Sequence, residues 1–186
     1  MPRRQRQSRP LPSLWLFSDE RVAAANLIRA AARLPRGSGI ILRHHATPLA
    51  ERRRLFETLR PIARRRGLVL VLAGKGTEAR GWGADGVHGS GQMRRAAGMI
   101  RTAPVHDPAE LRRAERHGAD LVFLSPLFAT RSHPGARPLG PVRFAALARQ
   151  AHVPVMALGG VARRHGRLIR MLGASGYGAI DSFGAR

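Results

Sequence analysis

The sequence contains no cysteine and few aromatic residues. Among its 186 residues the absence of cysteine excludes disulfide bonds, cysteine-ligated zinc or iron–sulfur clusters, and thiol catalysis. Aromatic side chains make up 5% of the chain and follow no RNA-recognition or zinc-finger pattern. No apolar run reaches the roughly 18 residues that a membrane helix needs. The basic start leads only into the short run Leu14–Phe17, without a signal-cleavage pattern, so we expect a cytoplasmic protein.

Acidic residues are also scarce, because 11 Asp and Glu stand against 33 Lys and Arg, for a formal net charge of +22 at pH 7. Lys75 is the only lysine. Such a charge attracts polyanions of many kinds, including nucleic acids, acidic membranes and phosphorylated metabolites. The arginine runs Glu51–Arg54 and Arg64–Arg66 have helical surroundings, and we interpret them as solvated helix faces. We therefore expect only non-specific contact with nucleic acid.

Short apolar runs alternate with amphipathic stretches along the chain, which is the pattern of βα units and a parallel sheet. The eight runs are Leu14–Phe17, Gly39–Leu42, Leu68–Leu72, Gly86–His88, Met99–Thr102, Leu121–Leu124, Val153–Leu158 and Gly176–Ile180. The helical patterns are Arg21–Leu34, Leu49–Arg65, Thr77–Trp82, Pro108–His117, Val142–Gln150 and Ala162–Leu172, and Gly91–Gly98 fits one more turn. The alternation predicts a single closed (β/α)₈ TIM barrel over residues 13–186, after a disordered basic tail at residues 1–12.

The tripeptide Gly-Ala-Asp occurs twice, at Gly83–Asp85 and Gly118–Asp120, and Gly173–Ser175 is a variant of it. Each copy ends a predicted helix with glycine, for which a left-handed C-cap costs little, and then enters a strand. We interpret the repeat as the joint between helix and strand rather than as a binding site.

Functional residues of such barrels lie at the carboxyl ends of the strands. The irregular segment Ala129–Gly140 follows the sixth predicted strand and, at about twelve residues, has the length of a binding loop. Adjacent glycines, Gly159 and Gly160, follow the seventh strand, where backbone amides can approach an anion closely. The loops after strands seven and eight often hold phosphate, so we predict a phosphate site at Gly159, Gly160, Ile180 and Ser182.

Three segments resemble the thiamine phosphate synthase/TenI family, whose members join a hydroxymethylpyrimidine diphosphate to a thiazole phosphate. Gly118–Pro134 is similar to the family's strand six and its Gly-Pro-x-Phe-x-Thr-x-Thr-Lys loop, Val153–Val161 to strand seven and its Gly-Gly turn, and Gly83–His88 to strand four. The resemblance implies a TIM barrel of thiamine biosynthesis whose partners are phosphorylated small molecules. It leaves open whether the chain forms a homo-oligomer.

The resemblance also assigns residues to ligands. The loop hydroxyls that grip the thiazole and the diphosphate match Thr130 and Ser132, and His133 stands where the family has a lysine. Arg43 matches the arginine of the family's Gln-Leu-Arg-x-Lys motif. Because histidine can act as acid or base near neutral pH, His133 joins Arg43 and Lys75 as a candidate catalytic residue.

The sequence departs from the family where carboxylates hold magnesium. The positions of these acids read Ala73-Gly74 and Met93. Magnesium sites usually use one or two carboxylates, so we predict no metal and no cofactor, with Lys75 as a substitute charge. The lysine of the strand-two motif becomes His45, and Pro126 stands where the family's tautomerase branch has its histidine.

Three functions stay open at this point. In the first, a thiamine phosphate synthase uses the charges of Arg43, Lys75 and His133 to stabilise the leaving diphosphate. The second is a TenI-like thiazole tautomerase, with His133, His88 or His106 as its acid–base group, or a metal-independent protein that binds a phosphate ligand. The third is a catalytically silent basic barrel that binds a phosphorylated ligand or nucleic acid.

Overall fold

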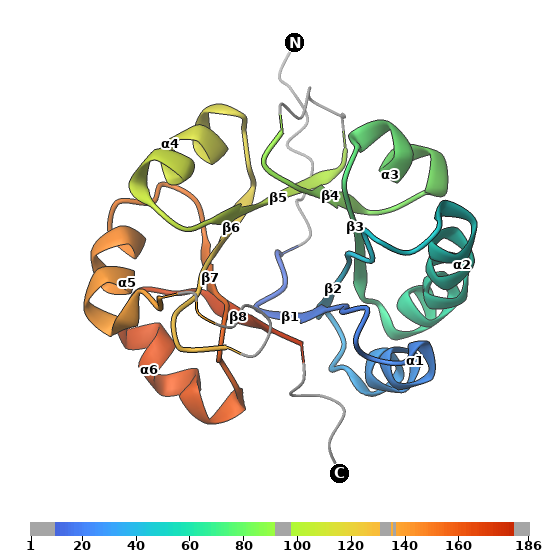
Figure 1. Cartoon of the computed structure of the whole chain (residues 1–186), viewed down its shortest axis with the longest axis horizontal. Helices are drawn as coiled ribbons and strands as arrows, with labels where there is room; N and C mark the ends of the chain where they lie inside the picture. The colour runs from blue at the N-terminus through green and yellow to red at the C-terminus, as the bar shows by residue number, and fades with distance from the viewer. Residues whose placement is uncertain (1–9, 92–97, 131–134, 136, 181–186) are drawn as a thin grey trace.

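Eight parallel strands form a closed barrel (Figure 1) in the computed structural model, which describes residues 10–91, 98–130, 135 and 137–180. Neighbouring strands pair in chain order, and β1 closes the ring by pairing with β8. The strands are β1 Leu14–Phe17, β2 Gly39–Leu42, β3 Val69–Ala73, β4 Gly86–His88, β5 Ile100–Val105, β6 Leu121–Leu124, β7 Val155–Ala157 and β8 Gly176–Ala179. The predicted TIM barrel is confirmed.

Helices surround the ring of strands within the described residues (Figure 1). They are α1 Ala24–Arg33, α2 Leu49–Arg66, α3 Gly76–Trp82, α4 Pro108–Arg116, α5 Gly140–Ala148, the 3-10 helix η1 Arg163–His165, and α6 Gly166–Met171. The extra turn predicted within Gly91–Gly98 falls mostly outside the described residues. β5 continues past its predicted end at Thr102 to Val105, because pairing with β6 extends it.

Apolar side chains fill two layers, one inside the barrel and one beneath the helices. Inside, the Trp15 and Phe123 rings meet edge to face at 5.5 Å, and the Phe17 and Phe123 rings at 4.7 Å. Outside, strand residues such as Leu70 pack in the same cluster as Phe56 of α2. Both faces of the strands are therefore buried, which explains why they are almost continuously apolar.

The Gly-Ala-Asp repeat is a structural joint, as predicted. Gly83 and Gly118 adopt φ of 72° and 75° where a helix ends. The carboxylate of Asp85 accepts a hydrogen bond from the Leu70 amide at 2.8 Å, and that of Asp120 accepts one from the Arg101 amide at 2.7 Å. Each aspartate thus fastens the start of its own strand to the neighbouring strand.

The chain just before β1 also contacts the barrel. Leu11 packs against the interior cluster, and the Pro12 carbonyl accepts a hydrogen bond from the Trp15 indole at 2.7 Å. Residues 1–9 lie outside the described part, and the predicted boundary between tail and domain stays a prediction. Among the described helices, none is both long enough and apolar enough to cross a membrane.

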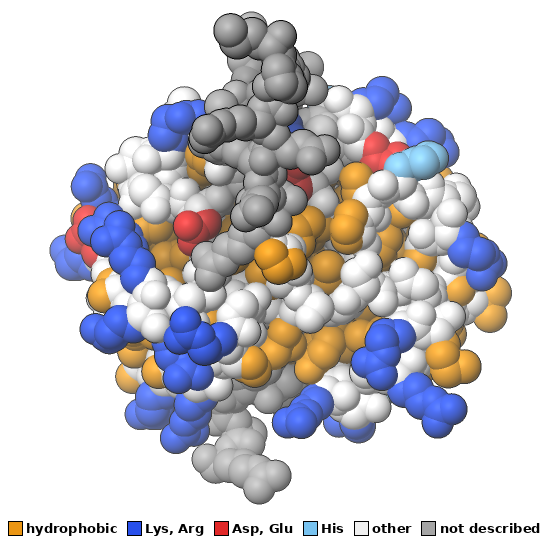
Figure 2. Space-filling model, turned by 180° about the vertical axis from the view of Figure 1, so that it is seen from behind, with side chains coloured by type: hydrophobic (Ala, Val, Ile, Leu, Met, Phe, Trp, Pro, Cys, Tyr) orange, Lys and Arg blue, Asp and Glu red, His pale blue; other side chains and the backbone are white. Residues whose placement is uncertain are grey.

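Most members of the arginine runs on α2 are solvent-exposed, as predicted. Arg53, Arg54, Arg64 and Arg65 are exposed, and Figure 2 shows Lys and Arg side chains spread around the rim of one face of the molecule. Arg66 is half-buried and donates a hydrogen bond to the Leu34 carbonyl, and Arg52 departs furthest from the prediction, because only 6% of it is exposed. The prediction that the whole run Glu51–Arg54 is solvated is therefore wrong for this residue.

Replacing Asp85 with alanine removes the acceptor of the Leu70 amide and should lower the free energy of unfolding by about 1–3 kcal/mol. Glu57→Ala removes only an exposed partner of Arg53 and should cost less than about 1 kcal/mol. Urea unfolding followed by circular dichroism measures both changes. Equal losses in the two variants would contradict the role assigned to the joint.

Candidate functional site

The described candidate residues lie at one end of the barrel. Arg43 follows β2, Lys75 follows β3, Gly159 and Gly160 follow β7, and Ile180 follows β8. Because the strands are all parallel, their carboxyl ends surround one opening, which we call the mouth. Thr130, in the loop after β6, is also described, whereas four other named positions lie outside the described residues: Met93, Ser132, His133 and Ser182.

The two glycines after β7 adopt left-handed backbone conformations, with φ of 86° at Gly159 and 66° at Gly160. The loop after β6 packs directly on them, and the Phe128 amide donates a hydrogen bond to the Gly159 carbonyl at 3.0 Å. A Cβ on Gly159 would lie 2.7 Å from the Pro126 Cα, and one on Gly160 would lie 2.6 Å from the Ala129 carbonyl oxygen. Glycine is therefore required here by both conformation and space.

This turn has backbone donors available for an anion. The amides of Gly159 and Gly160 donate no hydrogen bond to any part of the chain that the structure describes. Gly160 is exposed, so its amide can meet a ligand without displacing a hydrogen bond to the described residues. The Ile180 side chain is apolar and packs against the interior cluster. Only its backbone is left to contact a phosphate.

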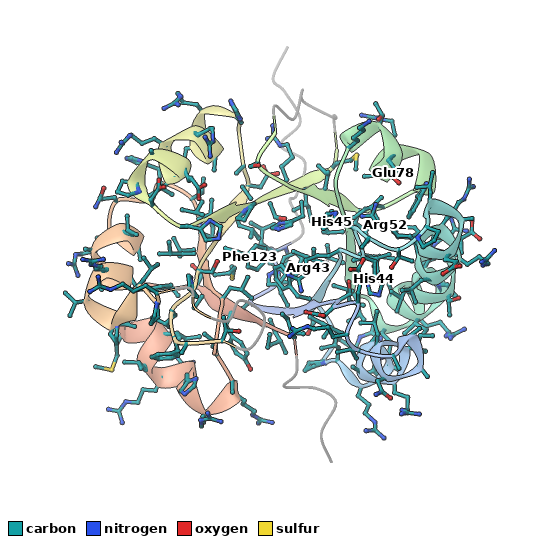
Figure 3. All side chains as sticks on the ribbon, in the orientation of Figure 1. Arg43, His44, His45, Arg52, Glu78 and Phe123 are labelled. Atoms are coloured by element: carbon teal, nitrogen blue, oxygen red, sulfur yellow. The ribbon has the colours of Figure 1, made fainter. Side chains whose placement is uncertain are left out.

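Arg43, which follows β2, is held at the mouth by the end of β1. Its Nε donates a hydrogen bond to the Ser18 carbonyl at 2.8 Å, and its Nη2 lies 3.3 Å from Asp19 Oδ2. Its guanidinium lies over the Phe17 ring, 5.6 Å from the centroid. The Ser18 hydroxyl oxygen accepts a hydrogen bond from the Arg43 amide, and it lies 2.8 Å from His44 Nδ1. β1 thus holds Arg43 near the centre of the ring of strands (Figure 3).

The Asp19 carboxylate is kept ionised by its arginine neighbours. A hydrogen bond from the Arg21 side chain, supported by the Arg21 amide and the charges of Arg21 and Arg43, lowers the pKa of Asp19 to about 2, although burial opposes this. Asp19 therefore balances part of the positive charge at this side of the mouth.

The described histidines offer weak acid–base chemistry. His88 is buried, its Nδ1 lies 2.8 Å from Thr102 Oγ1, and its ring meets those of Phe17 and Phe123 edge to face. Burial, together with the charges of Arg43 and His45, lowers the pKa of His88 to about 3. His88 is therefore neutral and a poor base near neutral pH.

His106 is also occupied, since its Nδ1 lies 2.8 Å from Glu110 Oε2 at an exposed position. Of the three histidines named as acid–base candidates, His88 and His106 are thus held by protein partners. The third, His133, is outside the described residues.

Arg52 is the functional candidate that sequence reasoning missed. Its Nη1 lies 3.5 Å from Glu78 Oε2 of α3, its Nη2 donates to the Ala73 carbonyl at the end of β3, and its guanidinium lies over the Trp82 ring. A signal was present, because Arg52 precedes the buried Phe56 by four residues and so shares its apolar helix face. Its place in an arginine run hid that spacing.

The residues at the end of β3 do not fit a magnesium ion. Gly74 has no side chain, and a Cβ placed on it would lie 3.6 Å from Glu78 Oε2, a carboxylate already paired with Arg52. Magnesium requires oxygen ligands at about 2.0–2.1 Å in near-octahedral geometry. No group of at least three His, Asp or Glu that could hold a metal occurs among the described residues.

Comparison with known proteins places the chain among similar sequences and structures. Residues 14–183 match the family model described as thiamine monophosphate synthase. The chain is 30% identical over 181 residues to the thiamine-phosphate synthase of Chlorobium luteolum, covering 92% of this chain and 84% of that one. It is 27% identical over 180 residues to the thiamine-phosphate synthase of Chloroflexus aurantiacus, covering 91% and 83%.

A solved structure supports the same grouping. The thiamine phosphate pyrophosphorylase from Pyrococcus furiosus superposes with a TM-score of 0.79 at 25% sequence identity, covering 96% of this chain and 90% of that one. The likeness therefore extends over nearly the whole barrel.

Gly160→Ala should lower the free energy of unfolding more than Gly37→Ala. Both positions have positive φ, which costs alanine about 1–2 kcal/mol, but Gly37 has open space and Gly160 faces the Ala129 carbonyl. Thermal and urea unfolding of the two variants measures the difference. If both substitutions lower the free energy of unfolding equally, the packing of the β6 loop does not require glycine at position 160.

Asp19 should stabilise the fold in a pH-dependent way. Its pKa of about 2 in the folded protein lies below the 3.8 of an unperturbed aspartate, so its contribution is present above pH 3.8 and is lost as pH falls through 2. Asp19→Asn should cost on the order of 1–2 kcal/mol near neutral pH and much less at strongly acidic pH. Urea unfolding across this range measures the trend, and a pH-independent cost would contradict it.

Proposed function

The chain belongs to the thiamine monophosphate synthase family, and from this we propose that it binds a thiazole phosphate and a pyrimidine diphosphate at the mouth of its barrel. The proposed activity joins the two ligands in thiamine biosynthesis. The thiazole nitrogen forms a bond to the methylene carbon of the pyrimidine, the bond from that carbon to oxygen breaks, and its electron pair leaves with diphosphate.

One observation carries the proposal for the thiazole phosphate. Gly159 and Gly160 present two amides without hydrogen-bond partners in the described chain, at a turn where larger residues do not fit. Consecutive amides in such a turn form a concavity that suits an anion. Thr130 lies in the adjacent loop, and Ser132 and Ser182 stay predicted ligands.

The leaving diphosphate is assigned to the side of the mouth that carries Arg43. Diphosphate gains negative charge as it leaves, so a fixed cation lowers the barrier by stabilising that charge. Arg43 is held by Ser18 and Asp19 before any ligand arrives, which removes the need to reorganise. Lys75 is exposed just after β3 and adds a second charge, while His133 stays a predicted third.

The alternatives have less support from the geometry. A tautomerase needs an acid–base group, but burial makes His88 a weak base and Glu110 occupies His106. A specific nucleic-acid surface would gather the charge on one face, whereas the exposed arginines occur on several helices, among them α1, α2 and α4. We therefore favour the synthase-type reaction over the two alternatives.

The proposal is tested by incubating the protein with both precursors, with added magnesium and separately with a chelator, and measuring thiamine phosphate by mass spectrometry. Product under both conditions is the expected result. Calorimetry with the thiazole phosphate alone tests the glycine turn independently. The absence of product under both conditions would sink the transferase assignment.

Arg43→Met should weaken binding of the pyrimidine diphosphate by about ten- to a hundredfold, since a charge-assisted hydrogen bond contributes about 1.5–3 kcal/mol. Binding of the thiazole phosphate should change little. Arg33→Met is the matched control. Arg33 lies in the last turn of α1, so this substitution removes the same charge at a position away from the mouth. Similar losses in both variants would show that net charge alone attracts the ligand.

A further inference from the structure

The ion pair of buried Arg52 and half-buried Glu78 lies beside the end of β3 (Figure 3). A Cβ on Gly74 would stand 3.6 Å from Glu78 Oε2 and 3.9 Å from Arg52 Nη1. The guanidinium also donates to the carbonyl of Ala73, the last residue of that strand. The pair is therefore anchored to the backbone at the rim of the mouth.

Stability alone does not explain this pair. Arg52 Nε and Glu78 Oε1 are both buried, and neither has a hydrogen-bond partner among the described residues. Removing two charges from water is costly, and an unsatisfied donor and acceptor add to that cost. Apolar residues of similar volume often serve a protein core equally well or better. Because burying the Arg52 charge is unfavourable for stability, its presence here indicates an electrostatic role.

The charge of Arg52 reaches the side chains of the mouth. After burial, the Arg52 guanidinium is the largest influence that lowers the pKa of His45, ahead of Arg43, and it outweighs the opposing effect of Glu78. Burial is the main cause that lowers the pKa of His44, the Glu20 carboxylate opposes it, and Arg52 adds to the lowering more strongly than Arg43 does. Although Glu78 balances the pair in formal charge, the positive field of Arg52 at His45 is thus not cancelled.

We propose that Arg52 is a positioning residue whose fixed guanidinium supplies positive potential at the end of β3, so that this side of the mouth holds a diphosphate anion without a divalent metal ion. This inference rests on the proposed function in one respect, which is that the diphosphate binds at the side of the mouth formed by the ends of β2 and β3. Arg52 acts through the electrostatic field and through the backbone of β3, and Arg43 and Lys75 are the groups that face the ligand.

The arrangement also works against a metal ion. A divalent cation beside Gly74 would compete with Arg52 for the Glu78 carboxylate and would be repelled by the guanidinium. The guanidinium stays charged at any physiological pH and is held before the ligand arrives. Magnesium in solution instead binds free diphosphate, so adding it should leave the affinity unchanged or lower it.

The test is calorimetry with inorganic pyrophosphate in the presence of a chelator. The wild-type protein should bind it, and Arg52→Gln should weaken binding about fivefold or more. Arg53→Gln removes the same charge from the next position of α2, where the side chain is exposed and pairs only with Glu57, and should change binding less than about twofold. A requirement for magnesium, or equal losses in the two variants, would overturn the proposal.

Glu78→Gln provides a variant with the opposite expected sign. It keeps the shape of the side chain but removes the negative charge that opposes Arg52, so pyrophosphate should bind more tightly. The pKa of His45, followed by NMR, should fall in Glu78→Gln and rise in Arg52→Gln. A purely structural role would not move these values in opposite directions, and weaker binding in Glu78→Gln would contradict the proposal.

Binding of the thiazole phosphate separates this inference from the proposed function. Arg52→Gln should leave that affinity within about twofold, because the glycine turn lies across the mouth. Failure of the wild-type protein to bind the thiazole phosphate would remove the proposed function but not a metal-free pyrophosphate site. Failure of the wild-type protein to bind pyrophosphate under any condition would remove the inference about Arg52.

Discussion

Edge-to-face packing of Trp15, Phe17 and Phe123 fills the inside of the barrel, and the closed ring of strands depends on it. The Phe17 and Phe123 rings form the floor of the mouth, because Phe17 lies beneath the Arg43 guanidinium and both rings contact His88 edge to face. The interior is therefore not a channel. A ligand can meet only what the carboxyl ends of the strands place above these rings.

We propose that the two sides of the mouth hold anions by different means. After β7, the backbone provides donors, because Gly159 and Gly160 adopt conformations that leave their amides without partners in the described chain. After β2 and β3, side-chain charge provides the attraction, with Arg43 fixed by Asp19 and Arg52 fixed by Glu78. At His45 the charge of Arg52 has a larger effect than that of its partner Glu78.

Predictions from sequence succeeded where one residue type has one physical reason to be present. The strands could be predicted because burial on both faces makes them apolar. Gly83 and Gly118 could be predicted as helix ends because their left-handed conformations favour glycine. The Gly159–Gly160 turn was placed at the mouth for a similar local reason, whereas Arg43 was placed there by its resemblance to the family's strand-two motif. The roles of Ser132, His133 and Ser182 stay predictions, since these residues lie outside the described part.

By itself the sequence determined the barrel, its helix–strand joints and the glycine turn, because periodicity and backbone conformation are local properties. Only the tertiary structure decided which arginine of Glu51–Arg54 is buried and which acid it meets. Arg52 belongs to α2 and Glu78 to α3, and the two side chains meet only when both helices pack beside β3. Electrostatic pairing depends on distance in space, which the order of residues along the chain does not specify.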